Sequence, residues 1–189
     1  MNHWLLKSEP ETFSIDALSK APKQTTTWDG VRNYQARNML RDSMKEGDQA
    51  FFYHSGCDVP GIAGIVAIVK EGYPDKTAFD PKHHHYDAES KADAPRWYVV
   101  DVKFVRKFKR IITLDELRQH AAKSLKDFVL LRRGNRLSVM PVTKKDWEFV
   151  LALECRSLSE VVHIATTFAT KKRDGACKLI IRVYTRTPD

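Results

Sequence analysis

The residue pattern between positions 96 and 108 constrains the fold of this 189-residue chain more than any other feature. Side chains in this stretch fall into two alternating sets, and each set would lie on one side of an extended backbone. The first set is Trp97, Val99, Asp101 and Lys103, and the second is Tyr98, Val100, Val102 and Phe104. An α-helix does not produce a period of two. The stretch therefore predicts a β-strand.

The other expected elements are short and of mixed type. Further strands are expected over residues 3–7, 61–70 and 136–142 (ended by Pro141), and helices over residues 14–18, 113–117 and 147–153, with another helix between Asn33 and Gly47. Ser14, Thr113 and Thr143 have the side chains of N-caps. Residues 20–27 and 72–94 are polar, without apolar periodicity, and are expected to form loops. Because strands and helices do not alternate regularly, the sequence predicts an α+β fold.

Charge and composition limit the class of partner. The chain has 32 Lys and Arg against 24 Asp and Glu, and 42% of its residues are hydrophobic. The resulting net charge of +8 favours acidic partners, nucleic acid above all. Lys7 and Glu9 interrupt the only apolar run near the start, and no stretch approaches the ~20 apolar residues of a membrane helix. We expect no signal peptide, no membrane partner, and a cytoplasmic location, or a nuclear one in a eukaryote.

The cysteines support the same compartment. They are Cys57, Cys155 and Cys177. Their spacing matches neither a disulfide framework nor a CxxC metal site. Reduced thiols are therefore expected.

An aromatic ring, a turn, amides and guanidiniums follow one another closely between Thr27 and Asn38. Asp29 and Gly30 favour a turn, so a loop is expected to present Trp28. In the helix that follows, three polar side chains recur at every fourth residue, namely Asn33, Arg37 and Arg41. This combination suits a planar base and its phosphate. The alternative is that Trp28 fills the core and the arginines form a solvated face.

A second basic segment lies in the expected strand and beyond it. Its cations are Lys103, Arg106, Lys107, Lys109 and Arg110, interleaved with Phe104 and Phe108. A basic turn over residues 132–136 adds further arginines, Arg136 among them. Such cations would hold phosphates and make binding sensitive to salt. The alternative is a charged sheet edge that prevents aggregation.

Catalytic and metal-binding patterns are weak. His54 and Cys57 are too close in sequence to face each other as a nucleophile and its base. Residues 83–85 are three consecutive histidines, but consecutive residues of a regular element cannot all face one ion, so a solvated loop is expected. Gly61 and Gly64 lie within an expected strand and lack the Lys-Ser/Thr of a P-loop. The sequence thus indicates binding without catalysis, metal or cofactor.

Seven ordered motifs resemble a known family. They are residues 4–10, 27–38, 52–55, 61–69, 73–75, 96–97 and 136–143. With them, residues 1–153 resemble the EVE domain of the thymocyte nuclear protein family, within the PUA-like superfamily. The resemblance implies a mixed β-barrel with peripheral short helices. Residues 154–189 are an extension outside the resemblance, and the run 179–184 could pair as a strand or belong to an unstructured tail.

The resemblance also implies a site. The expected base pocket consists of Lys7, Ser8, Trp28, Asn33, His54 and Ser138. Trp28 would stack on the base, Asn33 and Ser8 would read its edge, and the small side chain of Ser138 would allow close approach. The expected phosphate contacts are Arg32, Arg37, Lys103, Arg106, Lys107, Lys109 and Arg136.

The function expected from this site is that of a non-catalytic reader of a modified base, a methylated or oxidised cytosine, in DNA. Two alternatives are open. One is an RNA-binding module, since relatives with PUA-like folds commonly bind RNA. The other is an enzyme that acts on a small nucleotide-like molecule through His54 and Asp58.

Overall fold

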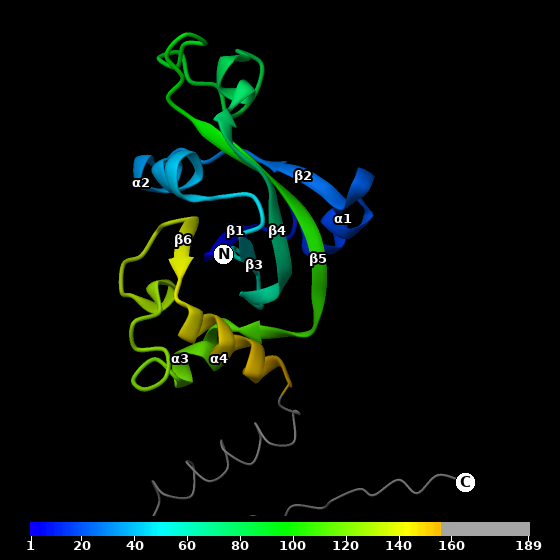
Figure 1. Ribbon diagram of the computed structural model, residues 1–189, viewed down its shortest axis with the longest axis vertical. Helices are drawn as coiled ribbons and strands as arrows, with labels where there is room; N and C mark the ends of the chain where they lie inside the picture. Colours follow the sequence, from blue (N-terminus) through cyan, green and yellow to red (C-terminus); the bar gives the residue numbers. More distant parts are fainter. Residues whose placement is uncertain (156–189) are drawn as a thin grey trace, which may run out of the picture. The chain divides into compact units, whose positions relative to one another are not determined.

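The structure, a computed structural model, describes residues 1–155, which form a six-stranded sheet with short helices around it (Figure 1). The strands are β1 (His3–Ser8), β2 (Thr25–Trp28), β3 (Gln49–His54), β4 (Gly61–Pro74), β5 (Tyr98–Thr113) and β6 (Val139–Val142). Their order in the sheet is β2-β5-β4-β3-β1-β6. Only β1 and β3 are parallel, and the other neighbours pair antiparallel.

The two longest strands, β4 and β5, form a hairpin that organises the sheet. Their register runs from Gly61 opposite Thr113 to Pro74 opposite Tyr98, with several shifts. Such bulges bend a strand pair, and β5 curves along one side of the domain (Figure 1). Gly64 permits the close approach, because a Cβ there would lie 2.5 Å from the carbonyl oxygen of Arg106. The strand predicted from residue 96 to 108 is confirmed, but it begins at Tyr98 and continues to Thr113.

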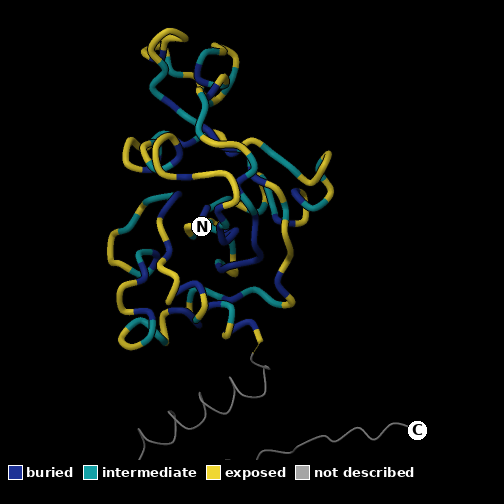
Figure 2. The backbone as a smooth tube through the Cα atoms, viewed as in Figure 1, coloured by how far each residue is buried: buried dark blue, intermediate teal, exposed yellow. Residues whose placement is uncertain are grey.

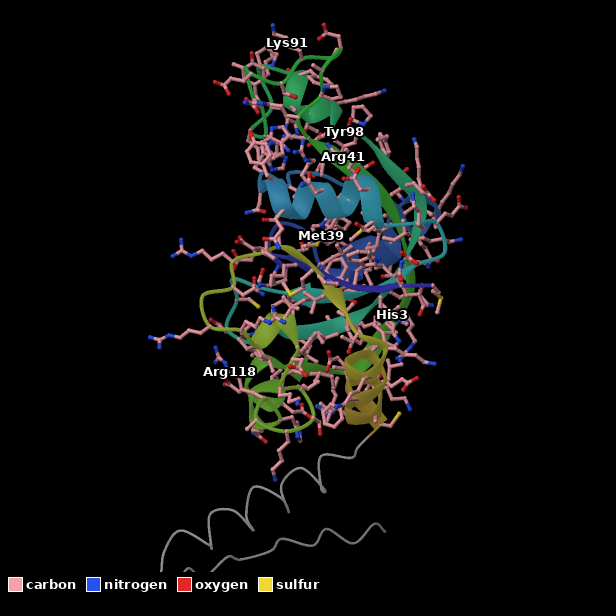
Figure 3. All side chains as sticks on the ribbon, turned by 60° about the vertical axis from the view of Figure 1, so that its left-hand side comes forward. His3, Met39, Arg41, Lys91, Tyr98 and Arg118 are labelled. Carbon is pink, nitrogen blue, oxygen red and sulfur yellow. The ribbon has the colours of Figure 1, made fainter. Side chains whose placement is uncertain are left out.

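The helices are α1 (Ile15–Lys20), α2 (Tyr34–Asn38), α3 (Leu114–Gln119) and α4 (Lys144–Cys155), with 3-10 turns η1 (Pro22–Gln24), η3 (Lys76–Phe79) and η4 (Val129–Leu131) and a π-turn η2 (Met39–Ser43) after α2. The expected caps are confirmed. Ser14 and Thr113 accept hydrogen bonds from the backbone of α1 and α3, and Thr143 accepts one from the Asp146 N–H. In η2, the Arg41 guanidinium lies 5.6 Å from the Tyr98 ring centre on β5 (Figure 3).

The sheet has a hydrophobic core on each face. On β1, Trp4 and Leu6 belong to one cluster and Leu5 to the other. On β3, Phe52 and Phe51 divide in the same way, as expected of alternating side chains. Helices α1 and α2 contribute to the first cluster, α3 and α4 to the second. Figure 2 shows the buried backbone concentrated in the sheet and the exposed backbone in the peripheral loops.

Residues 20–27 are not the loop that we expected. Pro22–Gln24 form a 3-10 turn, and Thr25–Trp28 form β2, which pairs with β5. Trp28 therefore ends an edge strand, opposite Val100, instead of being presented by a loop. Successive β-branched threonines suit a strand, and the pairing with β5 outweighs their polar character.

Two other boundaries also differ from expectation. The prediction of a loop over residues 72–94 is partly wrong, because β4 continues to Pro74 and η3 follows it. The last strand does not begin at residue 136 or end at Pro141, but covers Val139–Val142. Pro141 is accommodated within it because β6 is an edge strand, paired only with β1.

The predicted α+β class with peripheral short helices is confirmed. The expected mixed β-barrel is not closed, because the six-stranded sheet is open. Within residues 1–155, β2 and β6 form its two edges and are not paired with each other. No helix in this part of the chain is long and apolar enough to cross a membrane. The run 179–184 lies outside the described residues.

Candidate functional site

A pocket of about 550 Å³ lies where the ends of β1 and β2 meet the residue before β6. It is lined by Lys7, Ser8, Glu9, Thr12, Phe13, Thr26, Thr27, Trp28, Asp29, Gly30, Val31, His83, His84, His85 and Ser138. Four of the six side chains expected in the base pocket are among them, from three separate segments. They are Lys7, Ser8, Trp28 and Ser138.

The pairing of β1 with β6 brings two of these segments together. Leu6 lies opposite Val139, and one residue further along, the Lys7 N–H donates a 2.8 Å hydrogen bond to the Ser138 carbonyl oxygen. The Ser8 hydroxyl donates to the Phe13 carbonyl oxygen at 2.7 Å, which ties the segment before α1 to the same wall. The backbone therefore fixes the positions of both serines.

Trp28 belongs to the core and to the pocket wall at once. Its side chain is only 7% exposed and packs edge-to-face against Phe52, with ring centres 5.4 Å apart. The next turn uses Gly30 at φ +73°, a conformation that favours glycine. Trp28 therefore packs in the core, which was one alternative from the sequence, and also lines the expected pocket, which was the other.

Lys7 is a half-buried cation in this wall. Within residues 1–155 its ammonium has no carboxylate in ion-pair contact. Burial lowers the pKa of Lys7, because the charged form loses solvation. Glu9, two residues on, adds an exposed carboxylate to the lining. A donor-only group and an acceptor-only group therefore share the pocket.

Asn33 and His54 do not line this pocket. Asn33 is exposed and is the N-cap of α2, where its Oδ1 accepts a 3.0 Å hydrogen bond from the Ala36 N–H. His54 is buried, and its Nε2 accepts a 3.2 Å hydrogen bond from the Ile15 N–H. Burial lowers the pKa of His54. Both side chains therefore have structural partners here.

The guanidiniums near α2 are engaged within the domain. Arg32 donates to Asp75 at 2.8 Å and to the carbonyl oxygen of His85. Burial alone would raise the pKa of Asp75, but hydrogen bonds from Thr77 and Arg32 lower it overall. Arg37 donates to its neighbour Asn38 at 2.8 Å and to the Arg96 carbonyl oxygen. Through its hydrogen bond to the His85 carbonyl oxygen, Arg32 joins the turn after β2 to the three histidines at 83–85.

The cations of β5 divide into two groups. Arg106 pairs with Glu154 and Lys107 with Asp16, each at 2.8 Å. Lys103 and Lys109 are exposed, and neither side chain has an ion pair in the described residues.

The arginines of the turn before β6 are nearer to the pocket in sequence. Arg132, Arg133 and Arg136 are exposed and have no ion pair within residues 1–155. Arg136 precedes the lining residue Ser138 by two positions. This turn therefore leads into the pocket wall at Ser138.

Sequence reasoning missed several lining residues. Glu9 stands inside the motif 4–10, and its position next to Ser8 was the available signal. Phe13 lies in the turn after β1, where nothing in the sequence points to the pocket. Residues 83–85 were assigned to a solvated loop, and their place in the wall depends on contacts across the fold.

Comparisons with known proteins identify the family. The EVE domain family matches residues 2–153. Thymocyte nuclear protein 1 of Homo sapiens is 54% identical over 168 residues, which cover 81% of this chain and 74% of that protein.

Solved structures of related proteins have a similar fold. The crystal structure of human THYN1 protein in complex with 5-methylcytosine containing DNA has a TM-score of 0.80 and 52% identity, covering 83% of this chain and 99% of that chain. A structure from Pseudomonas syringae has a TM-score of 0.76 and 50% identity, covering 80% and 99%. The predicted family resemblance and PUA-like α+β fold are confirmed.

Proposed function

The chain belongs to the EVE domain family, and we propose that it is a non-catalytic module that binds DNA and takes a methylated or oxidised cytosine into the pocket beside Trp28. One observation carries the proposal: the Lys7 ammonium, which has no ion pair within residues 1–155, the Glu9 carboxylate and two serine hydroxyls line the same pocket. The complex of the human relative with 5-methylcytosine containing DNA supports the same ligand class.

The polar lining complements the edge of cytosine. The exocyclic amino group of cytosine donates and suits a carboxylate such as Glu9. The ring nitrogen and carbonyl oxygen of cytosine accept, and Lys7 offers donors only. Ser8 already donates to Phe13, so its oxygen is left as an acceptor, while Ser138 can serve in either role. This set recognises cytosine, and the apolar wall around Trp28 accommodates a substituent on its ring.

A base in a duplex has to leave the stack to enter such a pocket. Trp28 is too deeply buried for a base to lie flat on its ring in the present arrangement. Stacking on Trp28 therefore requires neighbouring lining side chains to move aside when the base enters. Without such movement, Trp28 contributes to the pocket only as a lining residue of its wall.

Phosphate contacts are best supplied by exposed cations without intramolecular partners. Within the described part of the chain, Arg132, Arg133 and Arg136 meet this condition before Ser138, and Lys103 and Lys109 meet it on β5. Arg32, Arg106 and Lys107 would first have to exchange a carboxylate for a phosphate. We therefore assign the main phosphate contacts to the turn over residues 132–136.

Incubation of the full-length protein with ligands of each class tests the function. The panel contains a DNA oligonucleotide with 5-methylcytosine, the RNA of the same sequence, and the free modified nucleoside. We expect retention of the DNA with its mass unchanged. Turnover of any ligand, detected by mass spectrometry, would establish an enzyme, and stronger retention of the RNA would establish the RNA-binding alternative.

A further inference from the structure

Three consecutive histidines gather on one wall of the pocket. The ligand nitrogens of His83, His84 and His85 all lie within 4.8 Å of one another. The ring centres of His83 and His84 are 4.5 Å apart, and those of His84 and His85 are 3.8 Å apart. Consecutive residues of a strand or helix could not bring three imidazoles together in this way.

A tight turn makes this clustering possible. The His83 N–H donates to the Asp80 carbonyl oxygen at 2.9 Å, and the Tyr86 N–H donates to the His83 carbonyl oxygen at 2.9 Å. The chain reverses over these residues, so neighbouring side chains point to a common centre. A solvated loop was expected because consecutive residues of a helix or strand cannot all face one ion. Residues 83–85 form a turn instead, so their side chains can face one ion.

Two nitrogens of the cluster are poorly satisfied. His85 Nδ1 is buried and has no hydrogen-bond partner among the described residues. A buried polar atom without a partner is costly, and each case in a native structure calls for an explanation. His83 Nδ1 accepts only a 3.1 Å hydrogen bond from the His85 backbone N–H, which a stronger bond to an ion can replace. His84 is exposed, and its ring lies against both neighbouring imidazoles.

The surrounding residues hold the cluster in place. A Cβ on Gly30 would lie 2.3 Å from Cε1 of His85, so the imidazole packs directly on this glycine. Arg32 binds the His85 carbonyl oxygen, and its charge is balanced by Asp75. The backbone on which the three rings are mounted is therefore fixed by contacts to the turn after β2.

We propose that His83, His84 and His85 bind one divalent transition-metal ion, of the zinc or nickel class, on the wall of the pocket. Imidazole nitrogen is a preferred ligand of these ions. A tetrahedral ion bound at about 2.1 Å keeps its donors roughly 3.4 Å apart, so ligand atoms that lie within 4.8 Å of one another have to move closer by side-chain rotation when the ion binds. Three protein ligands leave a fourth position open toward the pocket.

Titration of the untagged, full-length protein with Zn²⁺ against a chromophoric chelator tests the proposal. We expect one ion per chain. His84→Asn and His83→Asn should each weaken binding by more than the ~10–100-fold that loss of an outer-shell partner costs. His120→Asn, which changes a histidine outside the cluster, is the matched control and should leave the affinity unchanged. Equal affinity in all four proteins would overturn the proposal.

The visible absorption spectrum of the protein with Co²⁺ in place of Zn²⁺ reports the coordination number of the ion, independently of protein stability. We expect the intense visible absorption of a four-coordinate ion in the wild-type protein and its loss in His84→Asn. A spectrum like that of the hydrated ion would overturn a three-histidine site. Circular dichroism of each variant checks that the fold is retained.

The position of the site predicts coupling to DNA, a consequence that rests on the proposed function. An ion and a base that share the pocket change each other's affinity by the same factor, because linkage is reciprocal. The Zn²⁺ affinity should therefore differ with and without bound 5-methylcytosine DNA. Identical affinities, in a protein that binds both ligands, would overturn the shared location. Failure to bind DNA would instead affect the proposed function and leave the Zn²⁺ titration as an independent result.

Discussion

The Lys7 N–H and the Ser138 carbonyl oxygen are joined by a 2.8 Å hydrogen bond that links the end of β1 to the residue before β6. Two segments more than a hundred residues apart in the chain thus form one edge of the pocket. Because this bond uses backbone atoms, it survives side-chain substitution. The contribution of the Lys7 ammonium can therefore be tested separately from the architecture.

Lys7→Met should weaken binding of modified DNA by about 1.5–3 kcal/mol, the size of a hydrogen bond to a charged group. The same change should leave the melting temperature equal or raise it, because a half-buried ammonium that has no ion pair among residues 1–155 is costly. Calorimetric titration and thermal unfolding measure the two effects. Lys145→Met on α4, outside the pocket, is the control and should change neither quantity. Loss of stability in Lys7→Met would contradict the assignment.

Trp28→Ala should destabilise the domain by about 3–5 kcal/mol, because a large buried side chain is removed from the core. Trp28→Phe should cost less, since a ring still packs on Phe52. Denaturant unfolding followed by circular dichroism gives both free energies. A Trp28→Ala variant as stable as wild type would show that the ring is not part of the core.

Sequence periodicity was sufficient to predict the long strand β5 but not the short strand β2. The alternation from residue 96 to 108 predicted the long strand because a half-buried strand leaves that pattern. Strand β2 was missed because its threonines acquire their role only from pairing with β5. Similarly, nothing local reveals that β1 lies between β3 and β6, yet this arrangement places Lys7 beside Ser138.

The sequence predicted only part of the pocket lining, because local motifs do not show which residues meet across the fold. Ser8, Trp28 and Ser138 stand in motifs that the family resemblance brought out. Asn33 has the side chain of a base reader, but an Asn before a helix is also a good N-cap, and the structure places it in that role. Intramolecular partners of arginines depend on tertiary contacts, so the pairing of Arg32 with Asp75 could not be read from charge alone.

Replacing Arg132, Arg133 and Arg136 by Gln should lower affinity for modified and unmodified duplexes by the same factor. Each lost phosphate contact should reduce the slope of log affinity against log salt by about 0.9. The ratio of modified to unmodified affinity should survive, because phosphates carry no information about the base. A matched variant removes the same charge at three exposed cations that do not line the pocket and have no ion pair within residues 1–155, Lys123, Lys126 and Lys145. Equal slopes in the two variants would exclude the turn over residues 132–136 from the interface.

His54 should make folding sensitive to mild acid. Burial lowers its pKa below the ordinary 6.5, so between these two pKa values the unfolded chain binds more protons than the folded one. Stability conferred by the neutral imidazole is therefore present above pH 6.5 and decreases as the pH falls toward the lowered pKa. The difference in unfolding free energy between wild type and His54→Gln should change with pH in this window. A constant difference from about pH 5 to 8 would contradict the assignment.

The central claim is that the pocket distinguishes a modified cytosine from cytosine. The most direct measurement compares, at one salt concentration, the affinities of the full-length protein for two duplexes that differ by a single 5-methyl group. Burial of that methyl group contributes about 0.8 kcal/mol, so we predict at least about fourfold tighter binding of the methylated duplex. Equal affinities for the two duplexes would contradict the account.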